Sequence, residues 1–245
     1  LKQIVVIVCA TIFFVACGNK NEEKDYTQFV NPFIGTGGHG HTFPGAVVPN
    51  GGIQPSPDTR IDGWDACSGY HYSDSTINGF SHTHLSGTGC CDYGDVLMMP
   101  TVGEQKIAYL GKSSQQMAYA SVFSHENEVA EPGYYSVFLD TYGVKAELTA
   151  TKRVALHRYT FPETNQAGMI VDLDYSLQRQ KNENMSIEVI SDTEIAGSKM
   201  TVYWAFEQKI YFYAKFSEPF SSYQIITDSV MTENGLQPQS KVLIS

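Results

Sequence analysis

The second half of the chain consists of short segments in which apolar and polar residues alternate. In residues 144–152 (VKAELTATK) an apolar side chain recurs at every second position, which is typical of a strand with one buried face. No stretch shows the apolar stripe with caps that an amphipathic helix needs. The pattern therefore predicts an all-β fold, an antiparallel β-sandwich. Similar patterns predict further strands at residues 96–100, 134–139, 154–161, 169–173, 186–190 and 209–216, and a last strand at 241–245.

The pattern before residue 96 is different. Residues 31–95 contain little continuous apolar sequence, yet they hold five of the seven histidines, three of the five cysteines and one of the two tryptophans. Loops rich in such residues on a rigid scaffold are where binding and catalysis usually occur. The sequence therefore predicts a long Gly/His-rich loop region near the N-terminus that carries the functional residues.

The first residues have the pattern of an export signal. Lys2 precedes an apolar run at residues 4–16, which is too short for a stable membrane-spanning helix. Because Ala16 stands just before Cys17, the pattern is similar to a bacterial lipoprotein signal, in which Cys17 becomes the lipidated first residue. We expect a signal peptide at 1–16, a polar tether at 17–28 and a β-sandwich domain at 29–245. An ordinary cleaved signal and an uncleaved anchor are the alternatives.

A lipid on Cys17 would place the exported protein on a membrane, at the outer membrane, the cell surface or the periplasm. The chain has 16 Lys and Arg against 26 Asp and Glu, a net charge of −10, and no basic cluster. This balance argues against nucleic acid as a partner. An oxidising exterior would allow Cys67 to pair with Cys90 or Cys91, although free thiols are equally compatible with the sequence.

Two motifs in the loop region suggest bound cations or phosphates. Residues 35–41 (GTGGHGH) are glycine-rich but lack the Gly-Lys-Ser/Thr of a nucleotide site. His82 and His84 would point to one face of an extended segment, which suits a zinc or other transition-metal site. The alternative is that these imidazoles hydrogen-bond loop backbone or ligand hydroxyls. A metal site would also draw on neighbouring candidates: His39, His41, Asp92 and Asp95.

A third motif suits a sugar. Trp64 stands between Gly63 and Asp65, so an aromatic face lies next to a carboxylate in a loop. A pyranose stacks its C–H face on tryptophan, while polar groups bind its hydroxyls. Asp58, Asp62 and Asp65 could suggest a pair of hydrolytic carboxylates, but clustered loop aspartates are more often turn formers. A buried, loop-anchoring Trp64 is the structural alternative.

Together these motifs resemble the opening of glycoside hydrolase family 92, the exo-acting, calcium-dependent α-mannosidases. The matching segments are NPFIGTGGHGHTFPGA, SPDTR, GWDACSGYHYSD, GFSHTHLSGTG and DYGD, followed by GYYSVFLDTYGVKAELTATKRVALHRYTFP and IYFYAKFSEPF. The resemblance covers essentially the whole mature chain. Cys91 departs from the family pattern, where a glycine stands.

The resemblance implies an N-terminal β-sandwich that is followed, in the family, by a larger (α/α)6 helical domain. That domain carries a Glu acid and an Asp base, with which the family inverts the anomeric configuration. A calcium ion is bound largely by the same domain. We expect this chain to stop before the helical domain, and so to hold no catalytic residue and to be inactive alone. Its substrate would be a mannose-containing glycan.

By the same likeness, Trp64 is the foremost candidate for a sugar contact, and Asp65, His82 and His84 are further candidates. Two other functions fit the residues. One is a stand-alone glycan-binding surface lipoprotein that uses the same loops. The other is a metallohydrolase on a β-sandwich that uses the paired histidines.

Overall fold

The computed structural model describes residues 24–107, 115–227, 230–232 and 241–244. The predicted signal peptide, the lipidation site Cys17 and most of the polar tether lie outside these residues. The described part contains no α-helix, only four short 3-10 segments, as the absence of a helical stripe predicts. None of its helical segments is long and apolar enough to cross a membrane. The 3-10 segments are η1 (Thr27–Phe29), η2 (Trp64–Ala66), η3 (His125–Asn127) and η4 (Leu177–Arg179).

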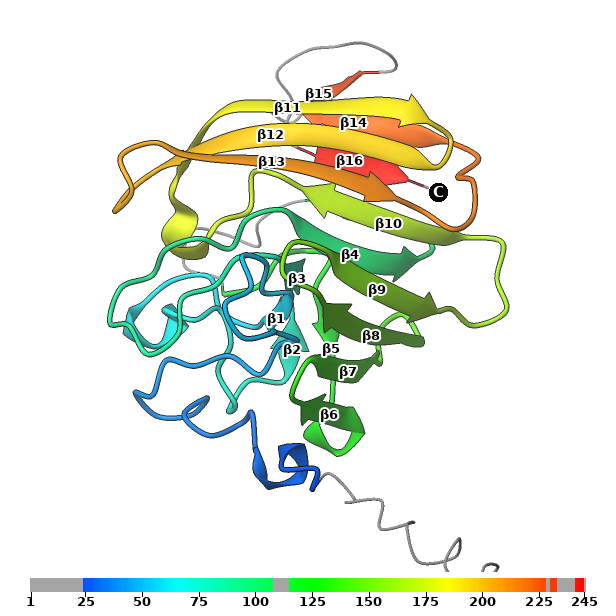
Figure 1. Cartoon of the computed structure of the whole chain (residues 1–245). Helices are drawn as coiled ribbons and strands as arrows, with labels where there is room; N and C mark the ends of the chain where they lie inside the picture. The colour runs from blue at the N-terminus through cyan, green and yellow to red at the C-terminus, as the bar shows by residue number, and fades with distance from the viewer. Residues whose placement is uncertain (1–23, 108–114, 228–229, 233–240, 245) are drawn as a thin grey trace, which may run out of the picture.

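A seven-stranded antiparallel sheet forms the middle of the molecule (Figure 1). Its strand order is β1-β3-β4-β10-β16-β14-β15. The central pair, β4 and β10, aligns Met99 with Ile170 and Met98 with Val171. The bounds of its strands are β1 (Ser56–Asp58), β3 (Gly79–Ser81), β4 (Leu97–Val102), β10 (Ala167–Asp172), β14 (Tyr223–Thr227), β15 (Val230–Thr232) and β16 (Lys241–Ile244).

Smaller antiparallel sheets pack against the central one (Figure 1). A three-stranded sheet has the order β11-β12-β13, and a four-stranded sheet has the order β6-β7-β8-β9. A two-stranded ladder joins β2 to β5. The bounds are β2 (Thr76–Ile77), β5 (Ser121–Val122), β6 (Glu128–Glu131), β7 (Tyr134–Leu139), β8 (Val144–Ala150), β9 (Ala155–Thr160), β11 (Lys181–Ser191), β12 (Glu194–Val202) and β13 (Gln208–Lys215).

Alternation along the central strands supplies two hydrophobic cores. Met99 and Ile170 point to one face and belong to a cluster that also includes Val144 of the four-stranded sheet. Met98 and Val171 point to the other face and join a cluster with Ile187, Ile195 and Phe212 of the three-stranded sheet. Successive residues of a strand face opposite ways, so a strand buried on both sides has few polar positions. The predicted antiparallel β-sandwich is confirmed.

The N-terminal loop region, blue to cyan in Figure 1, lies beside the sheets and is fastened to them by buried polar contacts. The Tyr70 hydroxyl donates to the Glu128 carboxylate (3.0 Å), which also accepts from Tyr135 (2.6 Å). These contacts tie the loops to β6 and β7 and hold the backbone that carries the candidate site.

Candidate functional site

The turn around Trp64 exposes the Trp64 side chain, leaves Asp65 partly exposed and buries the next two residues. Gly63 has a φ of 96°, a left-handed value that favours glycine, and it starts η2. Ala66 and Cys67 are buried in the core, and the Cys67 thiol donates to the Trp64 carbonyl (2.8 Å). This anchoring leaves the Trp64 side chain 59% exposed, with Asp65 beside it at the surface. The buried-anchor alternative for Trp64 is therefore wrong.

The second part of the site is the glycine-rich loop of residues 35–42. The loop crosses itself so closely that a Cβ on Gly40 would lie 2.2 Å from the Gly35 carbonyl oxygen, so only glycine fits there. The His71 ring nitrogen Nε2 lies 3.1 Å from the Gly38 carbonyl and fixes the tip of the loop. The glycines allow a tight backbone crossing that places His39 and His41 toward the Trp64 turn.

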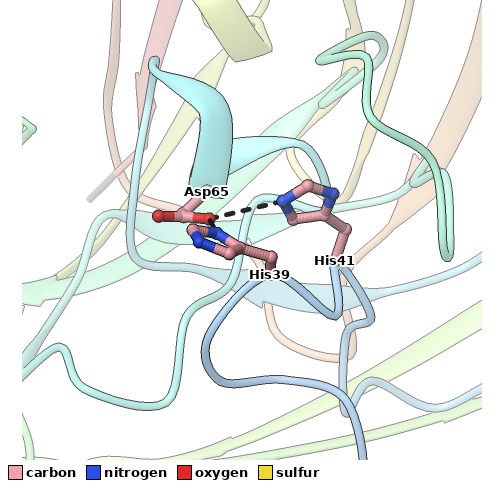
Figure 2. A group of neighbouring side chains, drawn as sticks. All are labelled: His39, His41 and Asp65. Atoms are coloured by element: carbon pink, nitrogen blue, oxygen red, sulfur yellow. Dashed lines mark hydrogen bonds and ion pairs between the residues drawn. The ribbon is translucent and has the colours of Figure 1, made fainter.

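His39, His41 and Asp65 meet at the surface (Figure 2). The His39 Nδ1 atom lies 2.6 Å from Asp65 Oδ1, and His41 Nε2 lies 3.4 Å from the same oxygen. His39 is exposed, whereas the His41 side chain is buried and its ring meets Trp64 edge-on, with centroids 5.0 Å apart. One carboxylate, two imidazoles and an indole therefore form a single cluster.

The cluster has the chemistry of a hydroxyl-binding surface. The hydrogen bond from His39 holds the pKa of Asp65 below its usual value, so the carboxylate is ionised at neutral pH and accepts hydrogen bonds. The imidazoles offer both donors and acceptors. The indole beside them offers an apolar face, and a pyranose needs this combination of apolar face and polar groups.

The same three residues could also hold a metal ion. In the part of the chain that the structure describes, they are the one group of three His, Cys, Asp or Glu residues with ligand atoms within 4.8 Å of one another. Two nitrogens and one oxygen suit zinc or another transition metal. They do not suit calcium, which takes six to eight oxygen ligands. This cluster is therefore not a candidate for a calcium site.

The structure does not bring His82 and His84 together as a metal-binding pair. His82 Nδ1 lies 2.6 Å from the Val96 carbonyl oxygen and the ring stacks on His157, with centroids 4.9 Å apart. His84 is only 3% exposed and contacts Asp58 (2.8 Å). Both rings position loop backbone in this arrangement. Their role as sugar contacts stays a prediction.

Ser81, His84 and Asp58 have the composition of a hydrolase triad but not its geometry. The Ser81 hydroxyl and the Asp58 carboxylate both lie against the same ring nitrogen, Nε2 of His84. The other ring nitrogen faces the Gln54 carbonyl (2.8 Å), and all three side chains are buried. A nucleophile and its orienting acid need opposite nitrogens of the histidine. The three residues form a buried structural network.

Other aspartates named from the sequence have partners elsewhere. Asp62 accepts from Arg179 (3.2 Å), and buried Asp95 pairs with Lys199 (3.0 Å). Asp92 accepts from the Tyr93 backbone N–H (2.9 Å). None of these three belongs to the group formed with His39 and His41. Their interpretation as structural loop residues fits these contacts.

Trp204 is a neighbour of the site that sequence reasoning missed. It lies in the turn between β12 and β13, is 75% exposed, and has its side chain next to the Cys90 thiol. Trp64 lies against the adjacent residue, Gly89, where an added Cβ would sit 2.6 Å from the indole. The signal that could have found Trp204 is the turn sequence Tyr-Trp-Ala-Phe at 203–206, since turns rarely expose three aromatic residues.

Fold and site together define an all-β domain with a surface site on its N-terminal loops. The chain belongs to the glycosyl hydrolase family 92 N-terminal domain family, whose model matches residues 29–243. An uncharacterized secreted glycosidase of the fungus Arthroderma benhamiae is 30% identical over 176 residues, which is 70% of this chain and 22% of that protein.

Solved structures give the same assignment. The family GH92 alpha-mannosidase BT3965 of Bacteroides thetaiotaomicron, solved in complex with mannoimidazole, is 37% identical with a TM-score of 0.81. That match covers 90% of this chain and 30% of the other. The family GH92 inverting mannosidase BT2199 of the same organism is 27% identical, with a TM-score of 0.71 and coverage of 91% and 30%. The chain thus spans less than a third of the length of these relatives.

Proposed function

We propose that this chain is the N-terminal domain of an exo-acting α-mannosidase that removes α-linked mannose from glycans with inversion. Support comes from the family match and from the mannosidases among the similar structures. The observation that carries the sugar-binding part is the exposed Trp64 indole beside the cluster of Asp65, His39 and His41. In this proposal the chain contributes sugar-contacting loops to an active site that it does not complete.

The residues of the site suggest that this chain contacts the sugar and that another domain carries out the hydrolysis. Inverting hydrolysis needs a protonated acid on the leaving-group oxygen and a second carboxylate that activates water. Asp65 is ionised and engaged by His39, and Asp58 is buried against His84, so neither is poised as such a pair. We therefore assign the acid, the base and the calcium ion to a helical domain outside this chain.

The site residues would bind the sugar and orient it, and would not take part in bond cleavage. The Trp64 indole would stack on the C–H face of mannose, and the Asp65 carboxylate would accept hydrogen bonds from ring hydroxyls. His41, buried between the loops, would keep the indole edge in place through their aromatic contact. Trp204, next to Cys90, would extend the aromatic surface toward a second sugar ring. The ligand would be a mannose-containing glycan.

Export is part of the proposal. The relative from Arthroderma benhamiae is described as secreted, and the apolar run before Cys17 has the pattern of a lipoprotein signal. A lipid on Cys17 would hold the domain on a membrane surface. A stand-alone glycan-binding lipoprotein is the second candidate, because the exposed indole and its polar neighbours all come from this one chain.

Binding of methyl α-D-mannopyranoside tests the sugar site. We expect saturable changes in amide chemical shifts around Trp64, and we expect Trp64→Ala to weaken binding about tenfold, or 1.4 kcal/mol. Tyr211→Ala removes another exposed aromatic, on β13, and should leave the affinity unchanged. Equal binding by the Trp64→Ala variant and the unaltered chain would refute the assignment.

A second assay separates the two candidates. The chain should release no mannose from an α-linked mannobiose, even at high protein concentration, because neither Asp58 nor Asp65 is poised as an acid or base. Turnover by the purified chain would contradict the assignment of catalysis to another domain. Micromolar binding of a larger mannose glycan by this chain alone would favour the stand-alone lectin.

A further inference from the structure

The thiols of Cys67 and Cys91 face each other in the protein interior, 3.7 Å apart between their sulfur atoms. Both residues are buried, at 1% and 3% exposure, and they come from two loops that are separated in sequence. Cys90 is half-buried and its sulfur turns toward the Trp204 indole. All three thiols are free in the structure. Of the three, Cys67 and Cys91 have their sulfur atoms in direct contact.

We propose that Cys67 and Cys91 are joined by a disulfide in the exported protein, and that this bond fixes the turn that carries Trp64. The bond forms by exchange with an oxidant that itself carries a disulfide, such as a thiol oxidoreductase or oxidised glutathione. One thiolate attacks the oxidant to give a mixed disulfide, and the second thiolate displaces the oxidant's other sulfur. Two protein thiols lose two protons and two electrons, and the oxidant leaves as a dithiol or as two thiols.

The geometry needs only a short approach of the two sulfurs. A disulfide has a bond length of about 2.05 Å, so the sulfur atoms must close most of the present gap by side-chain rotation and a small loop shift. Both thiols now donate to carbonyls of the Trp64 turn, Cys67 to Trp64 (2.8 Å) and Cys91 to Gly63 (3.2 Å). The Gly63 carbonyl also accepts from the Ala66 backbone N–H (3.1 Å), a hydrogen bond that does not depend on the thiols.

The bond would connect the two parts of the sugar surface. Cys67 directly follows η2, which carries Trp64 and Asp65. Cys91 lies two residues after Gly89, the residue on which the Trp64 indole rests. Closing the loop from residue 67 to residue 91 therefore holds the indole over its support. This consequence rests on the proposed sugar-binding function, whereas the bond itself does not.

The order of events follows from burial. Burial raises the pKa of both Cys67 and Cys91, so little thiolate exists once the domain has folded. Exchange must therefore take place mainly before the two loops close. The folded, reduced chain should oxidise slowly, and its half-buried Cys90 should react first with a thiol reagent.

Peptide mapping after export to an oxidising compartment tests the bond. The full chain is denatured, alkylated without reduction and cleaved with chymotrypsin, because no Lys or Arg separates the three cysteines. We expect a linked pair of peptides containing Cys67 and Cys91, with the alkyl group on Cys90. Alkylation of both Cys67 and Cys91 in the exported chain would overturn the proposal, as would a link from Cys67 to Cys90.

Matched variants assign the partners and separate this inference from the sugar proposal. Cys90→Ser should keep the linked pair, and Cys91→Ser should abolish it. Reduction should lower the melting temperature of the unaltered chain by about 5–10 °C and leave Cys91→Ser unchanged. An unchanged melting temperature in the linked protein would show that the bond does not fix the turn. A linked chain that binds no mannoside would refute the proposed function alone.

Discussion

At the scale of single residues, His82 shows how burial changes the role of a side chain that the sequence marks as a ligand. Its Nδ1 carries the proton that is donated to the Val96 carbonyl, and its ring stacks on His157. Burial lowers the pKa of His82 to about 4 and that of His157 well below its usual value. Both rings are therefore neutral at pH 7. As the pH falls below 6.5, these histidines bind protons in the unfolded chain but stay neutral in the folded chain.

This difference predicts how stability depends on pH. Because the folded pKa is lower than the unfolded value of 6.5, stability is complete above pH 6.5 and falls as the pH drops toward 4. We expect each histidine to contribute about 1–2 kcal/mol to the loss between pH 7 and pH 5. Urea unfolding at several pH values measures the slope.

Substitution at one of the two rings provides the control. His157→Phe keeps an aromatic partner for His82 and removes one titrating group, so the slope should become shallower. Tyr211→Phe changes an exposed aromatic ring outside this pair and should leave the slope as it is. Identical slopes for the unaltered chain and His157→Phe would contradict the explanation.

The candidate site could be predicted from the sequence only in part, because some of its residues are adjacent in the sequence and others are far apart. Trp64 and Asp65 are adjacent, so their motif is visible in the sequence. The partnership of Asp65 with His39 and His41 spans 26 and 24 residues and depends on how the glycine-rich loop crosses itself. Loop crossings leave no periodic signal. Of the two alternatives for His82 and His84, the metal-binding pair does not form, because the strand ends at Ser81.

At the scale of elements, a buried ion pair connects the loop region to the three-stranded sheet. Asp95, just before β4, and Lys199, on β12, lie 3.0 Å apart with both side chains fully buried. The Lys199 ammonium also donates to the Tyr175 carbonyl (2.8 Å), and Asp95 accepts from Thr83 (2.7 Å) and Gln208 (2.7 Å). Each charge is therefore compensated by its partner and by further hydrogen bonds.

Removing one member of this pair should cost more than removing both. Lys199→Met leaves an uncompensated buried carboxylate and should lower the free energy of unfolding by about 3–5 kcal/mol. The double variant Asp95→Leu, Lys199→Met removes both charges and should recover part of that loss. Chemical denaturation of the single and double variants measures the coupling. Additive losses would show that the two charges do not stabilise each other.

The same lysine explains why β12 (Glu194–Val202) was not predicted while its neighbours were. The strand predicted at residues 134–139 coincides with β7, because its apolar side chains mark the buried face. In β12 the inward positions are Ile195, Gly197, Lys199 and Thr201, so polar and small residues stand where the pattern expects apolar ones. Alternation reports burial only where buried side chains are apolar.

At the scale of the whole molecule, one sheet links two hydrophobic cores. Ile170 and Val171 are adjacent on β10, both fully buried, and they face opposite clusters. Since the same strand backbone supports both clusters, loss of packing on one face should loosen the pairing that the other face needs. We therefore expect the described domain to unfold as one cooperative unit.

Matched truncations on the two faces test this cooperativity. Ile170→Ala should cost about 2–5 kcal/mol, and Val171→Ala about 2 kcal/mol from two lost methylene-sized groups and their cavity. The exposed Val154→Ala should change stability by less than about 0.5 kcal/mol. Tryptophan fluorescence and far-ultraviolet circular dichroism should give coincident unfolding curves for every variant. Two separated transitions in the Val171→Ala variant would show instead that the three-stranded sheet can detach while the site-bearing part of the molecule stays folded.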